Sequence, residues 1–124
     1  MSYTYTFTDK LDYLLCVMDG EVKDVAVLIS IAEKLISKRH EFGNLRLLFD
    51  DRALTVDLSV YDATVFGAYL ENVNLASMGF RIAVVYSPRN KEISRIFETA
   101  ITNRSIAYQT FNDLKDAEKW LTTN

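Results

Sequence analysis

The chain has 124 residues, of which 49% are hydrophobic and 25% charged, and its formal net charge at pH 7 is −3. This length predicts one domain with a hydrophobic core, and the composition excludes a mostly disordered chain. Nucleic-acid binding depends on a surplus or a stripe of basic residues, so the acidic balance argues against a nucleic-acid partner. The only basic cluster, residues 38–40, lies at the expected end of a helix, where cations complement the helix dipole.

The first third of the chain predicts two strands and a helix. Aromatic residues and threonines alternate over 3–8, which is typical of an edge strand with one buried face. After a tight turn, residues 11–18 predict a second and more central strand, which Asp19-Gly20 is expected to end. Apolar residues then recur at helical spacing from Val25 and predict a helix that extends toward Gly43.

The remainder of the chain repeats strand-then-helix units. The expected strands cover 45–49, 80–86 and 106–111, and the expected helices start near Ser59, at Ser87-Pro88 and after Asn112-Asp113. This alternation predicts an α/β fold in a single domain over 1–124, with a mixed sheet of four to five strands. About four helices are expected, mainly on one face of the sheet.

The sequence also predicts a cytoplasmic location. No apolar stretch approaches the ~20 residues that cross a bilayer, so an integral membrane segment is not expected. The first residues do not resemble a signal sequence. A single cysteine, Cys16, cannot form an internal disulfide, which fits a reducing compartment.

A search for catalytic motifs finds little. Cys16 and His40 are the only residues of their kinds and are far apart in sequence, so neither a metal site nor a Cys–His pair is expected. The four glycines are scattered and form no phosphate-binding loop, so no cofactor is expected either. Asp50 and Asp51 could hold a cation or transfer protons, but we favour solvated turn residues that Arg52 neutralises. An enzyme built on the two aspartates and His40 is the least favoured function.

The order of the elements is recognisable. The strand Arg81-Ile82-Ala83-Val84-Val85, a last strand with Tyr108 and Phe111, and a final helix with Ala117 and Trp120-Leu121 follow the earlier units. This arrangement resembles the SpoIIAA-like family over nearly the whole chain. That family belongs to the STAS group, named for sulfate transporters and anti-sigma factor antagonists, and shares features with Sec14-type lipid-binding domains.

The STAS resemblance implies a regulatory module that acts through protein–protein interaction. In STAS antagonists, a partner kinase phosphorylates a serine at the start of the helix after the third strand, within an Asp-Ser-x-Gly-like turn. That turn is missing here, and Thr55 and Ser59 are the candidates for a phospho-switch. Ser59 and Asp62 also match a capping box, which is the favoured interpretation. We expect a protein partner or self-association, as a dimer, because an edge strand and seven tyrosines are available.

The Sec14 resemblance implies a different use of the fold, in which a lipid or another hydrophobic small molecule occupies an apolar cleft between helices and sheet. The same side chains would also form an ordinary helix-on-sheet core. A non-catalytic protein-binding module is therefore the leading hypothesis and hydrophobic ligand binding the alternative. The residues that could line such a cleft are Phe66, Tyr69, Leu70, Ile96 and Phe97.

Overall fold

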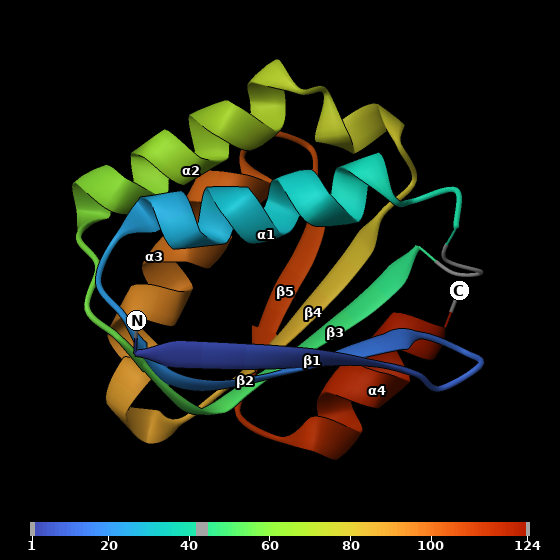
Figure 1. Cartoon of the computed structure of the whole chain (residues 1–124), viewed down its shortest axis with the longest axis horizontal. Coiled ribbons are helices and arrows are strands. Elements are labelled where there is room, and N and C mark those ends of the chain that lie inside the picture. The colour runs from blue at the N-terminus through green and yellow to red at the C-terminus, as the bar shows by residue number, and fades with distance from the viewer. Residues whose placement is uncertain (1, 42–44, 124) are drawn as a thin grey trace.

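The computed structural model describes residues 2–41 and 45–123. Within these residues, a five-stranded sheet carries three helices on one face and one on the other, as Figure 1 shows. The strands are β1 (Tyr3–Asp9), β2 (Leu14–Val22), β3 (Arg46–Val56), β4 (Arg81–Tyr86) and β5 (Ala107–Phe111). The helices are α1 (Val25–Ser37), α2 (Val60–Asn72), α3 (Lys91–Thr102) and α4 (Leu114–Thr122), and two short 3-10 helices, η1 (Leu75–Ser77) and η2 (Pro88–Asn90), precede β4 and α3.

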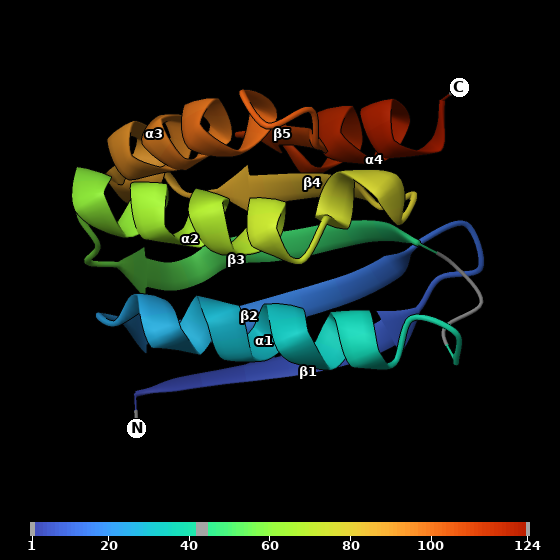
Figure 2. The same cartoon turned by 90° about the horizontal axis from the view of Figure 1, so that it is seen from above.

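The strands are arranged in the order of the sequence. β1 is antiparallel to β2, and β2 to β5 are parallel, so the sheet is mixed as expected. The chain moves across the sheet in one direction, and crossovers between parallel strands are right-handed. The three crossover helices α1, α2 and α3 must therefore cover the same face, which Figure 2 shows from above. Only α4, which follows the last strand, packs on the opposite face.

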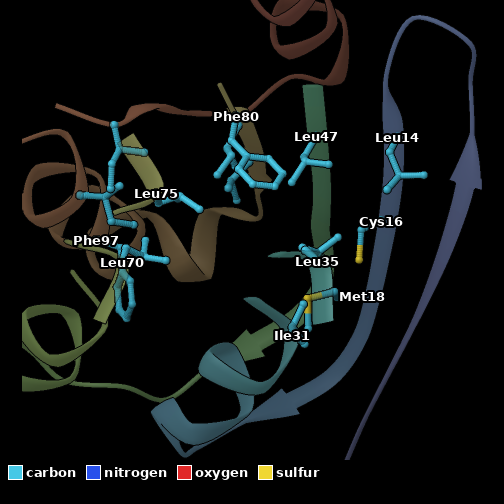
Figure 3. Packing of buried hydrophobic residues seen from close by; sticks show 14 of the residues in the cluster. Leu14, Cys16, Met18, Ile31, Leu35, Leu47, Leu70, Leu75, Phe80 and Phe97 are labelled. Atoms are coloured by element: carbon cyan, nitrogen blue, oxygen red, sulfur yellow. The ribbon is translucent and has the colours of Figure 1, made fainter. Parts of the chain in front are cut away.

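Two hydrophobic clusters fill the space on either side of the sheet. Alternate residues of β3 and β4 point to opposite faces, as the period of a strand requires. Leu47 and Ile82 belong to the larger cluster under α1, α2 and α3, whereas Leu48 and Ala83 belong to the smaller cluster under α4. Figure 3 shows the larger cluster, in which Phe97 and other side chains are directed toward the same interior.

The second strand extends farther than the sequence predicts. Asp19 and Gly20 do not end it, because β2 continues to Val22. Gly20 has a φ of 106°, and a Cβ atom at this position would lie 1.9 Å from the carbonyl oxygen of Ser2. The glycine therefore allows β1 to pass close to β2 instead of breaking the strand.

The third strand is also longer than the predicted residues 45–49. A register shift lies in its middle, where β2 advances two residues from Val17 to Asp19 while β3 advances three from Asp50 to Ala53. One extra residue in β3 corresponds to a β-bulge, a feature that redirects the side chains beside it. After the bulge, β3 continues to Val56.

The side chain of Asn90 in η2 holds the end of β3. This buried amide donates to the carbonyl oxygen of Leu54 at 2.7 Å and accepts from the backbone N–H of Val56 at 3.2 Å. A contact between residues more than thirty positions apart leaves no local signal, which explains why the predicted strand was too short.

The starts of α2 and α4 and the basic residues after α1 follow the predictions. Ser59 caps α2 and Asp113 caps α4, each by accepting a backbone N–H bond in the first turn. The basic residues 38–40 directly follow α1, and the guanidinium of Arg39 donates to the carbonyl oxygen of Ile36 at 2.6 Å. Gly43, toward which this helix was expected to extend, lies outside the described residues.

The start of the third long helix differs from the prediction. Ser87 precedes the short helix η2, where Pro88 takes the first position, and the serine side chain makes no capping bond. Its hydroxyl is buried without a hydrogen-bond partner among the described residues. The α-helix itself begins at Lys91.

No helix in the described part of the chain combines the length and apolar character needed to cross a membrane.

Candidate functional site

An apolar cavity lies between the sheet and the helices α1, α2 and α3. Its volume is about 130 Å³, close to the ~150 Å³ of an engineered apolar cavity that holds benzene in another protein. Its side chains come from β2, β3, β4, β5 and all three helices, and they are apolar except for Asp51, Ser94 and Tyr108. A pocket with mainly apolar walls and a few polar groups is typical of a small-molecule site.

The cavity exists because the helices on this face do not all lie equally close to the sheet. On this face α3 packs directly on β5, whereas α1 and α2 stand farther from the strands. α2 is instead held close to α3, since Gly67 lies where a Cβ atom would come within 3.1 Å of the carbonyl oxygen of Ala100. Glu71 of α2 also forms an ion pair of 3.3 Å with Arg104, just after the end of α3.

The helix α1 is not part of the close pair formed by α2 and α3 and lies over β1 and β2, as Figure 2 shows. The ammonium of Lys34 lies 5.6 Å from the ring centroid of Tyr5 in β1, on the side of α1 away from α2. Among the cavity residues on the two helices, Leu28, Ala32 and Ile36 of α1 and Phe66 of α2 are half-buried. Because these four side chains are partly exposed, the cavity wall between α1 and α2 is partly open.

Asp51 is the only charged residue of the cavity wall in the described part of the chain. It follows Leu47 and Phe49 on one face of β3 and comes just before the bulge. Its Oδ1 atom is buried without a hydrogen-bond partner among the described residues. Burial, together with the nearby charge of Asp50, raises the pKa of this carboxyl to about 7.

The neighbouring carboxyl of Asp50 has the opposite environment. It lies on the other face of β3, and Arg52 donates to its two oxygens at 2.9 Å and 2.8 Å. The hydrogen bonds from Arg52 hold the pKa of Asp50 below its usual value. The prediction that both aspartates are solvated turn residues neutralised by Arg52 was wrong, because both lie within a strand and Arg52 pairs with Asp50 alone.

Two further polar side chains reach the same space. Tyr108 of β5 lines the cavity, and burial raises the pKa of its phenol, with the charges of Asp51 and Glu98 acting in the same direction. Ser94 contributes from the first turns of α3. Both groups are neutral at physiological pH, so Asp51 dominates the electrostatics of the cavity.

The five residues predicted for a hydrophobic cleft lie on α2 and α3, on the face toward the sheet. Phe66, Leu70 and Phe97 line the cavity, and the rings of Phe66 and Phe97 are 6.1 Å apart between their centroids. Tyr69 and Ile96 pack against the same hydrophobic cluster without lining the cavity.

The two predicted phospho-switch residues have structural roles outside the cavity. The Ser59 hydroxyl accepts the backbone N–H of Asp62 at 3.2 Å, and the Asp62 carboxylate accepts the backbone N–H of Ser59 at 2.8 Å, so the predicted capping box is present. The Thr55 hydroxyl accepts a bond of 3.2 Å from the guanidinium of Arg89.

The cysteine and the histidine occupy different environments. Cys16 is buried in β2, and burial raises the pKa of its thiol to about 12, so the thiol stays neutral at physiological pH. His40 is exposed in the turn after α1. No group of three or more His, Cys, Asp or Glu side chains suited to a metal ion occurs among the residues that the structure describes.

Sequence reasoning did not identify Asp51, Ser94 and Tyr108 as residues of one cavity. For Asp51 a signal was available, because extending the predicted strand by two residues places it on the face of Leu47 and Phe49. For Ser94 and Tyr108 no local pattern indicates the cavity, since their meeting depends on how α3 and β5 pack.

The sequence matches no protein-family model and no curated protein. Among solved structures, the fold is similar to that of an uncharacterized protein of the DUF3478 family with a SpoIIAA-like fold from Shewanella loihica PV-4. The two chains are 19% identical, with a TM-score of 0.55 over 97% of this chain and 94% of the other. The protein therefore has a SpoIIAA-like α/β fold, as the order of its elements predicts.

Proposed function

We propose that the protein binds a hydrophobic small molecule in the cavity between the sheet and the helices α1, α2 and α3. The observation that carries this proposal is the cavity itself, which has an apolar wall and a volume of about 130 Å³. An ordinary helix-on-sheet core is packed without such a space, as interiors are normally filled to crystal-like density. The partly open wall between α1 and α2 offers a route for the ligand.

The proposal is for a binding module and not for an enzyme. The cavity wall contains one carboxyl that could act as an acid or a base, and its Oδ1 has no hydrogen-bonded partner to orient it. Catalysis by a carboxyl usually depends on a second group that positions it or completes the proton transfer. The arrangement supports the recognition of a ligand better than its chemical conversion.

The experiment is a titration of the purified protein with straight-chain alcohols of increasing length, followed by heteronuclear NMR. We expect saturable shifts for residues around the cavity. Ala32→Phe, which places a large ring in the cavity wall, is expected to abolish them, whereas Ala26→Phe on the exposed face of the same helix leaves them unchanged. Equal binding by both variants would contradict the proposal. Native mass spectrometry, compared with the denatured mass, then shows whether a ligand of lipid-like mass copurifies.

A second candidate function is protein–protein regulation through the start of α2. Val60 and Tyr61 are 62% and 74% exposed, directly after the cap residue Ser59. Large apolar side chains side by side on a surface are typical of an interaction site. In this proposal the partner is a second copy of the chain or a regulatory protein, as expected for a STAS-type module.

Sedimentation equilibrium of the purified chain tests the self-association. A dimer that Tyr61→Ser converts to a monomer would support this surface as an interface. A monomer at every concentration would rule out self-association here and leave only a different protein as partner.

A further inference from the structure

We propose that Asp51 is the polar anchor of the cavity, and that the ligand combines an apolar body with a hydrogen-bond-donating end, a hydroxyl or an amine, in preference to a carboxylate. This inference rests on the proposed function and specifies its ligand. It starts from a single buried oxygen, Oδ1 of Asp51, which has no hydrogen-bond partner among the described residues.

A buried polar atom without a partner is rare in folded proteins, because leaving it unpaired costs free energy. Here the atom belongs to a side chain in the wall of an apolar cavity and not to a filled core. Rotation of the carboxyl about its last side-chain torsion brings either oxygen toward the cavity. A donor group on a ligand would therefore satisfy an atom that the protein itself leaves unpaired.

The surroundings of Asp51 favour a donor over an anion. Asp50 is its neighbour in β3, and the negative charge of that residue acts on the Asp51 carboxyl. The charge of Glu98 in α3 acts on Tyr108 in the same cavity. No Lys, Arg or His side chain is part of the cavity wall in the described ranges, so a carboxylate ligand would enter without a counter-charge.

The position of Asp51 gives the ligand a defined orientation. The residue lies just before the bulge of β3 and opposite Tyr86, the last residue of β4, and Arg89 and Asn90 hold the β3 backbone just beyond it. The apolar wall at the other end of the cavity is formed by residues such as Leu75 and Phe80, before β4. The donor end is therefore directed to the β3 bulge and the apolar body toward Leu75.

The experiment compares probes of benzene size in the full chain by NMR titration. Phenol and toluene differ by a hydroxyl in place of a methyl, benzylamine supplies an ammonium, and benzoate supplies a carboxylate. The measured quantity is the affinity for phenol or benzylamine relative to that for toluene, in the wild type and in Asp51→Leu. The hydration free energy of each probe is the same whether it binds the wild type or Asp51→Leu. The change in this ratio between the two proteins therefore reports the contact with Asp51.

We expect Asp51→Leu to keep toluene binding and to lower the relative affinity for phenol, for benzylamine or for both by about tenfold. Which of the two probes responds distinguishes a hydroxyl from an amine. Asp50→Asn, the adjacent acid on the other face, is expected to leave the phenol-to-toluene ratio unchanged, because its carboxyl is held by Arg52 and not by the cavity. Benzoate is expected to bind the wild type at least tenfold more weakly than phenol.

Two results would overturn the inference while the proposed function stands: toluene binds but neither ratio changes in Asp51→Leu, or benzoate binds as tightly as phenol. Failure of the wild type to bind toluene or the alcohols would overturn the proposed function itself. If Asp51→Leu does not fold, Asp51→Asn provides an independent test. Its amide keeps an acceptor but loses the charge, so phenol binding should persist and benzylamine binding should weaken.

Discussion

Asp50 and Asp51 are neighbours in β3 whose carboxyls lie on opposite faces of the sheet. Asp50 pairs with Arg52 at 2.8 Å, whereas Asp51 lines an apolar cavity and has one buried oxygen without a hydrogen-bond partner among the described residues. The same residue type therefore has two environments within one dipeptide. Arg52 lowers the pKa of Asp50, and burial raises that of Asp51 to about 7. This difference makes each residue the natural control for the other.

Asp51 should make the stability of the protein depend on pH. Its pKa is about 7 in the folded state and near 3.8 in the unfolded state, so the folded protein binds more protons between these values. Stability should fall as the pH rises through this window, with a slope that approaches about 1.4 kcal/mol per pH unit, and should level off above it. Urea unfolding from about pH 4 to about pH 8 measures this slope.

Asp51→Asn should remove this fall in stability with rising pH, and Asp50→Asn should not. The pKa of Asp50 is lowered, so its contribution is present above its unfolded value and is lost only in more acidic solution. An identical dependence on pH in the wild type and in Asp51→Asn would show that the Asp51 carboxyl is not buried as described.

Asn90 should be important for the end of β3. Asn90→Ala leaves the carbonyl of Leu54 without this bond and the N–H of Val56 without an acceptor, so we expect a loss of about 2–3 kcal/mol in the free energy of unfolding. Arg89→Ala removes two exposed bonds and one half-buried bond to the same strand, but the Leu54 carbonyl keeps its bond from Asn90, so the loss should be about 1 kcal/mol. Chemical denaturation of both variants compares them, and equal losses would contradict the role assigned to Asn90.

The two faces of the sheet should respond differently to the loss of a leucine. Leu→Ala substitutions in a core cost about 2–5 kcal/mol, depending on the space already present. Leu121 of α4 is fully buried against the sheet, so its replacement should fall near the upper end of this range. Leu70 already borders the cavity and loses fewer contacts, so its replacement should fall near the lower end. A larger loss for Leu70→Ala in thermal or urea unfolding would indicate that the cavity is filled.

Ser59 should contribute to stability as a helix cap. Ser59→Ala removes the acceptor for the Asp62 N–H and should cost about 1 kcal/mol, whereas Ser59→Asp keeps a capping acceptor and should be nearly neutral. Thr64→Ala, on the same helix, is the matched control, because the Thr64 hydroxyl donates to the carbonyl of Val60 within the helix and does not cap an N–H group at its start. A variant Ser59→Ala as stable as the wild type would leave the serine without the structural role described here.

The sequence predicted most of the fold because its signals are local. Alternation in β1, the cap residues Ser59 and Asp113, and the apolar stripes of the helices each depend on neighbours within a few positions. The fold class and the capped starts of α2 and α4 followed from them.

The parts that could not be predicted depend on distant contacts. The extension of β3 depends on Asn90, and the passage of β2 through Gly20 depends on the close approach of Ser2. The cavity depends on how far α1 and α2 stand from the sheet, which no short pattern encodes. Phe66, Leu70 and Phe97 were identified as lining residues because they lie on the apolar faces of their helices. Asp51 was assigned to a solvated turn because β3 was predicted to end before it.

The central claim is that a hydrophobic molecule binds inside this cavity, and intermolecular NOE measurements on the methyl-labelled protein test it most directly. With bound toluene, we predict NOEs to methyl groups of Leu35, Leu70 and Ile82, which line the cavity, and none to Leu48 and Leu121 on the α4 face. The account would be contradicted if saturating toluene gave NOEs only to surface residues such as Val60, or none at all.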